Sequence, residues 1–74
     1  MTTLDYKFML YAVRRYVSWN KRVEYWNFWT DQWVMESEFD TDCMEHSWVA
    51  ENKAKECNAE LVPIMVSIKE GEYA

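Results

Sequence analysis

The chain has very few of the residues on which many active sites and small stabilised folds depend. Its 74 residues include one glycine, one proline, one histidine and two cysteines. A single glycine leaves no room for a glycine-rich phosphate loop. One histidine and two cysteines provide too few ligands for a structural zinc site, which normally needs four. The scarcity of glycine and proline also argues against disorder. We therefore expect a folded chain with no metal, no cofactor and no enzymatic activity.

The two cysteines could form one disulfide at most, and their spacing argues against it. Cys43 and Cys57 fall in one predicted helix. At about 1.5 Å per residue they lie roughly 21 Å apart, whereas a disulfide needs Cα atoms within about 7 Å. His46 follows Cys43 at a helical spacing, but no third group is evident that would orient it as a base. Both thiols are predicted to be free.

Long apolar runs are missing as well. Thr2, Asp5 and Lys7 interrupt the start of the chain, so we expect no signal peptide. No stretch approaches the ~20 apolar residues that span a bilayer. These features predict a cytoplasmic protein without a membrane partner, built as a single domain of residues 1–74.

Aromatic residues, in contrast, are abundant between residues 16 and 33. A single helix can shelter only some of these rings, because each presents roughly 150–250 Å². The remaining rings are expected to face a partner, a ligand or another copy of the chain. A chain this short buries only about 60% of its unfolded surface, so a homodimer is a further prediction. The rings are those of Tyr16, Trp19, Tyr25, Trp26, Phe28, Trp29 and Trp33.

The formal net charge of -5 is spread unevenly. Residues 1–30 carry five basic and two acidic side chains, a balance of +3, and residues 31–74 carry three basic and eleven acidic ones, a balance of -8. An acidic half repels nucleic acid and attracts basic protein surfaces. The same composition would also suit a solvated helix face that only keeps the protein in solution.

The first half of the chain favours strands. Residues 6–17 are rich in Tyr, Phe and Val but carry apolar side chains on both alternating faces, so a helix capped at Thr3 is the alternative. Residues 18–22 indicate a hairpin loop and residues 23–30 a second strand. After a turn at residues 30–32, residues 33–39 fit either a short third strand or an irregular return.

A helix is predicted over residues 42–57. Asp40 or Thr41 can accept a hydrogen bond from a free backbone N–H at its start. Small or apolar side chains recur every three or four residues and would let the helix lie close to a sheet. Asn58 suits a left-handed cap. The helix would turn an acidic face to water, with Glu45 and Glu56 among its residues.

The clearest strand is predicted over residues 61–69, where Pro63 indicates an edge position. One helix would then cover one face of a small antiparallel sheet. The predicted fold class is α+β, with three to four strands in the order β-β-(β)-α-β.

Protein binding is the function that these features favour. Interfaces concentrate Trp, Tyr and Arg as anchors, and an acidic helix could block a basic, nucleic-acid-handling surface. The alternative is a nucleotide or single-stranded nucleic-acid binder, in which rings stack on bases and basic side chains meet phosphates. A third reading places Trp26 and Phe28 under the helix, with Tyr25 and Trp29 packed in a dimer. The candidate interaction residues are Trp19, Tyr25, Trp29, Trp33, Arg14, Arg15, Glu45 and Glu56.

The second half of the chain carries a resemblance to a known group. Phe39-Asp40-Thr41 is followed by a helix with Ala50 and Ala54, and then by residues 59–64 with Val66 and Ile68. This sequence pattern resembles small uncharacterised bacteriophage-encoded proteins in which a hairpin precedes a helix and a final strand. The resemblance implies an accessory factor that binds a host protein in the host cell cytoplasm. Such factors include inhibitors of antiviral defence, for example anti-CRISPR proteins.

Overall fold

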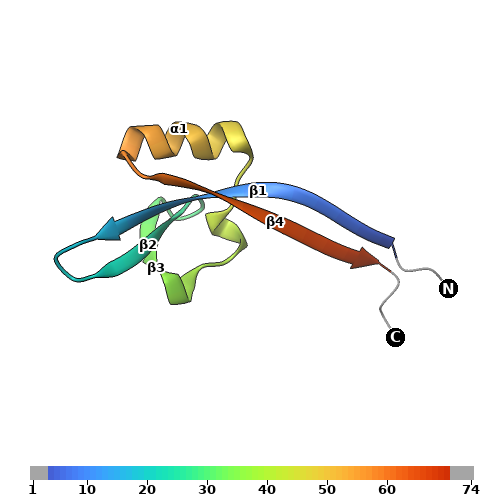
Figure 1. The fold of residues 1–74 in the computed structure, drawn as a ribbon, viewed down its shortest axis with the longest axis horizontal. Helices are drawn as coiled ribbons and strands as arrows, with labels where there is room; N and C mark the ends of the chain where they lie inside the picture. The colour runs from blue at the N-terminus through green and yellow to red at the C-terminus, as the bar shows by residue number, and fades with distance from the viewer. Residues whose placement is uncertain (1–3, 71–74) are drawn as a thin grey trace.

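A four-stranded antiparallel sheet and one α-helix make up the computed structural model, which describes residues 4–70 (Figure 1). The predicted α+β class is therefore confirmed, with the helix packed on one face of the sheet. The strands are β1 (Leu4–Val17), β2 (Arg22–Asn27), β3 (Gln32–Met35) and β4 (Glu60–Glu70), in the spatial order β3-β2-β1-β4.

The apolar residues on both faces of β1 belong to a strand and not to a helix. β1 is an inner strand, paired with β2 over residues 14–17 and with β4 over residues 4–14. Pro63 lies in β4, an edge strand, as predicted. A two-sided apolar strand is typical of a sheet that is covered on both faces.

The second strand is shorter than predicted because Asn27 starts a turn. Its side-chain Oδ1 accepts hydrogen bonds from the backbone N–H groups of Trp29 (2.9 Å) and Thr30 (3.0 Å). This closes the turn at residues 28–31 and ends β2 at Asn27 instead of Thr30. The next segment combines both predicted alternatives, a short strand β3 followed by an irregular return.

The predicted start of the helix is wrong. Asp40 does cap, since its side chain accepts from the N–H of Asp42 at 3.0 Å, but it caps only the short 3-10 turn η2 (Thr41–Cys43). Glu45 then exchanges two backbone hydrogen bonds with Tyr11, at 2.8 and 2.9 Å, which holds the chain extended. The helix α1 (Ser47–Cys57) begins only after this bridge.

The end of the helix is as predicted. Asn58 adopts the left-handed conformation (φ 53°, ψ 46°), and its N–H closes the last turn on the carbonyls of Ala54 and Lys55. The two cysteines are free, also as predicted, although the reason differs from the one expected. Cys43 lies buried in η2, outside the helix that carries Cys57.

The core is small and lies between α1 and the sheet. Val13 of β1 is fully buried against Ala50 and Ala54, whose short side chains let the helix approach closely. Trp26 and Phe28 pack around this cluster, which confirms their predicted place under the helix. Trp33 stands edge-on to Trp26, with ring centroids 5.3 Å apart.

The return segment between β3 and α1 covers part of the opposite face of the sheet. It contains η1 (Glu36–Glu38) and η2, and Phe39 between them packs edge-on against Tyr25 at 4.6 Å. Figure 1 shows this segment and α1 on opposite sides of β1 and β2. The middle of the sheet is therefore sandwiched, which explains why both faces of β1 are apolar there.

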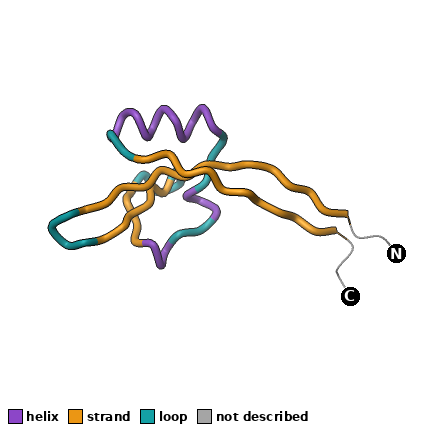
Figure 2. The backbone as a smooth tube through the Cα atoms, in the orientation of Figure 1, coloured by secondary structure: helices purple, strands orange, loops and turns teal. Residues whose placement is uncertain are grey.

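Beyond this sandwich, β1 and β4 continue alone as a two-stranded ribbon that carries both ends of the described chain (Figure 2). We call this ribbon the arm, formed by residues 4–10 paired with residues 64–70. It gives the molecule an elongated shape of 52 × 25 × 19 Å. Tyr6 and Phe8 on one face of the arm, and Met9 and Met65 on the other, are exposed.

Candidate interaction surfaces

Two hairpin loops of the same construction each present a tryptophan. The first loop spans residues 18–21 and the second spans residues 28–31; each ends in a left-handed residue, Lys21 or Asp31, with φ of 55°. Trp19 and Trp29 occupy the second position of their loops and are 85% and 82% exposed. The loops lie at opposite ends of β2, whose six residues span roughly 20 Å. The two rings therefore belong to separate surfaces.

The first loop is basic. Lys21 and Arg22 are exposed and form no ion pair with the described residues. Tyr16, near the same end of the hairpin, is also exposed. Trp19 thus stands beside two free cations, an arrangement that suits an acidic partner or a phosphate.

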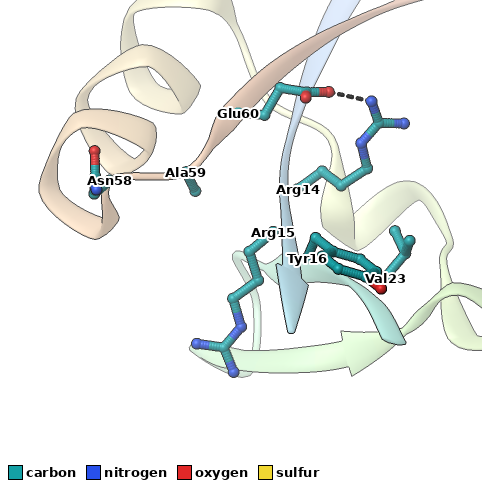
Figure 3. Close-up of a pocket in the computed structure, with 7 residues that line it drawn as sticks. All are labelled: Arg14, Arg15, Tyr16, Val23, Asn58, Ala59 and Glu60. Carbon is teal, nitrogen blue, oxygen red and sulfur yellow. Dashed lines mark hydrogen bonds and ion pairs between the residues drawn. The ribbon is translucent and has the colours of Figure 1, made fainter. Parts of the chain in front are cut away.

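A shallow hollow of about 210 Å³ adjoins this hairpin, at the corner where α1 turns into β4 (Figure 3). Arg14 and Arg15 line it but leave β1 on opposite sides. Arg14 forms an ion pair with Glu60. Side-chain hydrogen bonds, first with Tyr25 and then with Glu60, raise the pKa of the Arg14 guanidinium. The hollow is lined by Arg14, Arg15, Tyr16, Val23, Asn58, Ala59 and Glu60.

Arg15 is similarly occupied. It binds Glu24 through Nε at 2.8 Å and Nη2 at 2.7 Å, and its guanidinium carbon lies 4.1 Å from the centroid of the Trp33 ring. Both predicted arginines are therefore engaged by carboxylates of the chain itself. The adjacent negative charge weakens the attraction of each guanidinium for a phosphate.

The acidic surface does not lie on the helix, where we expected it. Within α1, Lys53 pairs with Glu56 at 3.2 Å and Lys55 with Glu51 at 3.5 Å, so the four charges cancel. Glu56, a predicted interaction residue, is exposed but neutralised in this way.

The uncompensated acids lie instead in the second loop and in the return segment. None of the six forms an ion pair with another described residue, and five are exposed, Glu45 being half-buried. The backbone N–H of Phe28 donates to the carbonyl of Asp42 at 2.9 Å, which joins the second loop to this segment. Glu36 and Glu38 follow β3 at its far end from this loop, where Met35 pairs with Glu24. We call Trp29, Asp31, Asp40 and Asp42 together the acidic face. The six acids are Asp31, Glu36, Glu38, Asp40, Asp42 and Glu45.

The predicted interaction residues thus divide into two groups. Trp19 and Trp29 are free to contact a partner, whereas Tyr25 and Trp33 are half-buried against Phe39 and Trp26. Sequence reasoning missed Trp48, which is 68% exposed in the first turn of α1. Trp48 follows the small-residue stripe in sequence, but at 3.6 residues per turn it lies nearly opposite Ala50 on the helix and so faces away from the core.

No group of three or more metal-ligating side chains comes together within residues 4–70. Nor does any helix in that range have the length and apolarity to cross a membrane. Comparison with known proteins found no family model, no curated protein and no solved structure that matches the chain.

Proposed function

We propose that the protein is a non-enzymatic binding factor whose acidic face docks on a basic surface of a partner protein. The observation that carries this proposal is the union of the exposed Trp29 with three nearby carboxylates that have no cationic partner among the described residues. A tryptophan that becomes buried on binding commonly anchors an interface. Surrounding charges of one sign steer a partner of the other sign and set its orientation.

The segment that carries the acids is held firmly enough to present them. Its two ends are tied to the sheet, by β3 pairing with β2 at one end and by the Glu45–Tyr11 bridge at the other. The Tyr25–Phe39 contact fastens its middle. A surface that is ordered before binding loses less conformational entropy when the complex forms.

A partner that normally binds nucleic acid would offer the required basic surface, and blocking it would inhibit that partner. The phage origin and the host defence target that the resemblance implies stay predictions. They fit this proposal, because nucleic-acid-handling proteins are strongly basic at their working surface.

The two matched loops make the test specific. The immobilised chain is incubated with bacterial lysate, and stoichiometric partners are identified by mass spectrometry. Trp29→Ala should weaken capture about 30-fold, the effect of losing an interface anchor of about 2 kcal/mol. Trp19→Ala removes the same side chain from the equivalent loop and should leave capture unchanged.

A second variant tests the charges without altering the backbone. The triple substitution Asp31→Asn, Asp40→Asn and Asp42→Asn keeps shape and polarity, and asparagine tolerates the left-handed conformation at residue 31. Capture by this variant should fall and lose its dependence on salt. Capture that depends on Trp19, or that ignores both changes to the acidic face, would contradict the proposal.

The basic first loop supports one alternative function, binding of a nucleotide or a single strand. Its support is that Trp19 lies beside the unpaired Lys21 and Arg22. If this alternative holds, nucleic acid should co-purify with the wild-type chain and raise the absorbance at 260 nm relative to that of the protein. Trp19→Ala should abolish this co-purification. Single-strand binders normally arrange several rings along one basic groove, and here the second exposed tryptophan lies in an acidic setting.

A further inference from the structure

One edge of the arm has a row of backbone groups that no residue in the range 4–70 pairs with. Tyr11 directs its N–H and C=O to Glu45, on the side of β1 that faces β2 further along. Because an antiparallel strand directs the backbone groups of alternate residues to the same side, Met9, Lys7 and Asp5 present theirs on that side too. Pairing with β2 begins only at Arg14. Such an open edge is a template for another strand.

The outer edge of β4 lacks one donor at the base of the arm. Pro63 of β4 faces Tyr11 across the sheet. Since the backbone groups of Tyr11 point to Glu45, this pair is not hydrogen-bonded, and the nitrogen of Pro63 points away from β1, to the outer edge of β4. Proline has no N–H to donate there. The row of donors along β1 has no such gap.

We propose that this open edge of β1 pairs with its counterpart in a second copy, β1 against β1 in antiparallel orientation, about a twofold axis at Tyr6. In this register Asp5 of one copy faces Lys7 of the other, and the symmetry repeats the match. Sliding by one step in either direction would place Asp5 opposite Asp5, or Lys7 opposite Lys7. Like charges directly opposite destabilise a sheet and unlike charges stabilise it, so the charge pattern selects one register.

Pairing of this kind would also complete the arm. A two-stranded ribbon is only marginally stable in water, whereas a sheet of three or more strands can be stable. Two arms together form a sheet of four strands in the order β4-β1-β1-β4. The exposed ring of Tyr6 then faces that of Tyr6 in the second copy, and the exposed ring of Phe8 lies diagonal to it on the same face.

The twofold arrangement occupies the β1 edge of both copies at once. A twofold interface uses the same patch on both copies and closes on itself. The arm also has no net charge, since Asp5 and Glu70 balance Lys7 and Lys69. The overall charge of -5 is thus concentrated away from the interface.

Charge reversal tests the register. The wild-type chain, of 9.0 kDa, should approach twice that mass by sedimentation as its concentration rises. Lys7→Glu and Asp5→Lys should each weaken the dimer at least about tenfold, because two facing pairs become repulsive. Two experiments should restore the dimer. The double variant Asp5→Lys/Lys7→Glu should dimerise by itself, because its facing charges are again opposite. The two single variants mixed together should form a heterodimer, since each alone has like charges facing each other. Lys55→Glu makes the same change of charge on α1 and should have no effect.

Amide exchange gives an independent reading of the same edge. In the monomer the N–H of Phe8, paired with β4, should exchange slowly and that of Lys7 quickly. Raising the concentration should protect Lys7 and leave Phe8 unchanged. A chain that stays monomeric up to about 1 mM, which is an association weaker than about 4 kcal/mol, would overturn the proposal. So would a dimer that is indifferent to the charge reversals.

Discussion

The stability of this protein should depend heavily on one valine. Val13 is 0% exposed and is the only fully buried residue larger than alanine or cysteine among residues 6–67. Its neighbours across the interface are Ala50 and Ala54, which have no spare side-chain atoms to fill a space. Val13→Ala should therefore leave a cavity that the helix cannot close without moving as a whole.

The magnitude follows from the atoms removed. Two carbon atoms leave the core, a transfer term of about 1.6 kcal/mol at roughly 0.8 kcal/mol each. A cavity that relaxes only in part adds about 1 kcal/mol. The loss of about 2.5 kcal/mol compares with a total stability of about 4–11 kcal/mol for 74 residues. It should lower the melting temperature by about 10–20 °C.

Urea and thermal denaturation at one fixed protein concentration would measure this loss. Val23→Ala is the matched control, because Val23 is half-buried at the edge of the hollow. The control should lose less than about 1 kcal/mol. Equal losses at the two positions, or a loss below about 1 kcal/mol at Val13, would show that the helix–sheet contact is not the main core.

Three further predictions concern a turn, a cap and a thiol. Asn27→Ala should cost about 2 kcal/mol in urea denaturation, because the N–H groups of Trp29 and Thr30 lose their acceptor; a cost under 0.5 kcal/mol, within the ordinary range of surface changes, would contradict the role of this side chain in the turn. Asn58→Gly should leave the free energy of unfolding nearly unchanged, and Asn58→Val should lower it by about 1–2 kcal/mol, because φ is 53° there. Equal melting temperatures for the two variants would contradict the role of Asn58 as a cap. Burial raises the pKa of the Cys43 thiol above its ordinary value of 9.0, so the folded state disfavours the thiolate. Its contribution to stability is complete below pH 9 and is lost as the pH rises through the raised pKa; Cys43→Ala should lack that part of the decline.

The two proposed surfaces occupy different parts of the molecule. The acidic face lies where the second loop meets η2, and the dimer edge lies on the arm. Substitutions on the arm should therefore change the mass of the particle without abolishing capture of a basic partner by each copy. This separation allows either proposal to fail without the other.

Local chemistry alone determined much of the architecture. β-branched and aromatic residues predicted β1 and β4, Pro63 predicted an edge, and Asn58 predicted the end of the helix. Each of these signals acts within a few residues, through a fixed φ angle, a missing N–H or the steric fit of a side chain to a pleated surface. They could therefore be read without knowing the rest of the fold.

Contacts between distant residues decided what the sequence by itself could not. The bridge between Glu45 and Tyr11 delays the start of α1, which removes Glu45 from the helix and leaves the helix neutral. A hydrogen bond from the N–H of Phe28 to the carbonyl of Asp42 brings Asp42 beside the loop that carries Trp29. The bridge between Glu45 and Tyr11 also shows which edge of β1 stays open. Backbone pairing across 34 positions leaves no periodic pattern in the chain, because any residue can supply an N–H and a C=O; only the folded structure selects the two that meet.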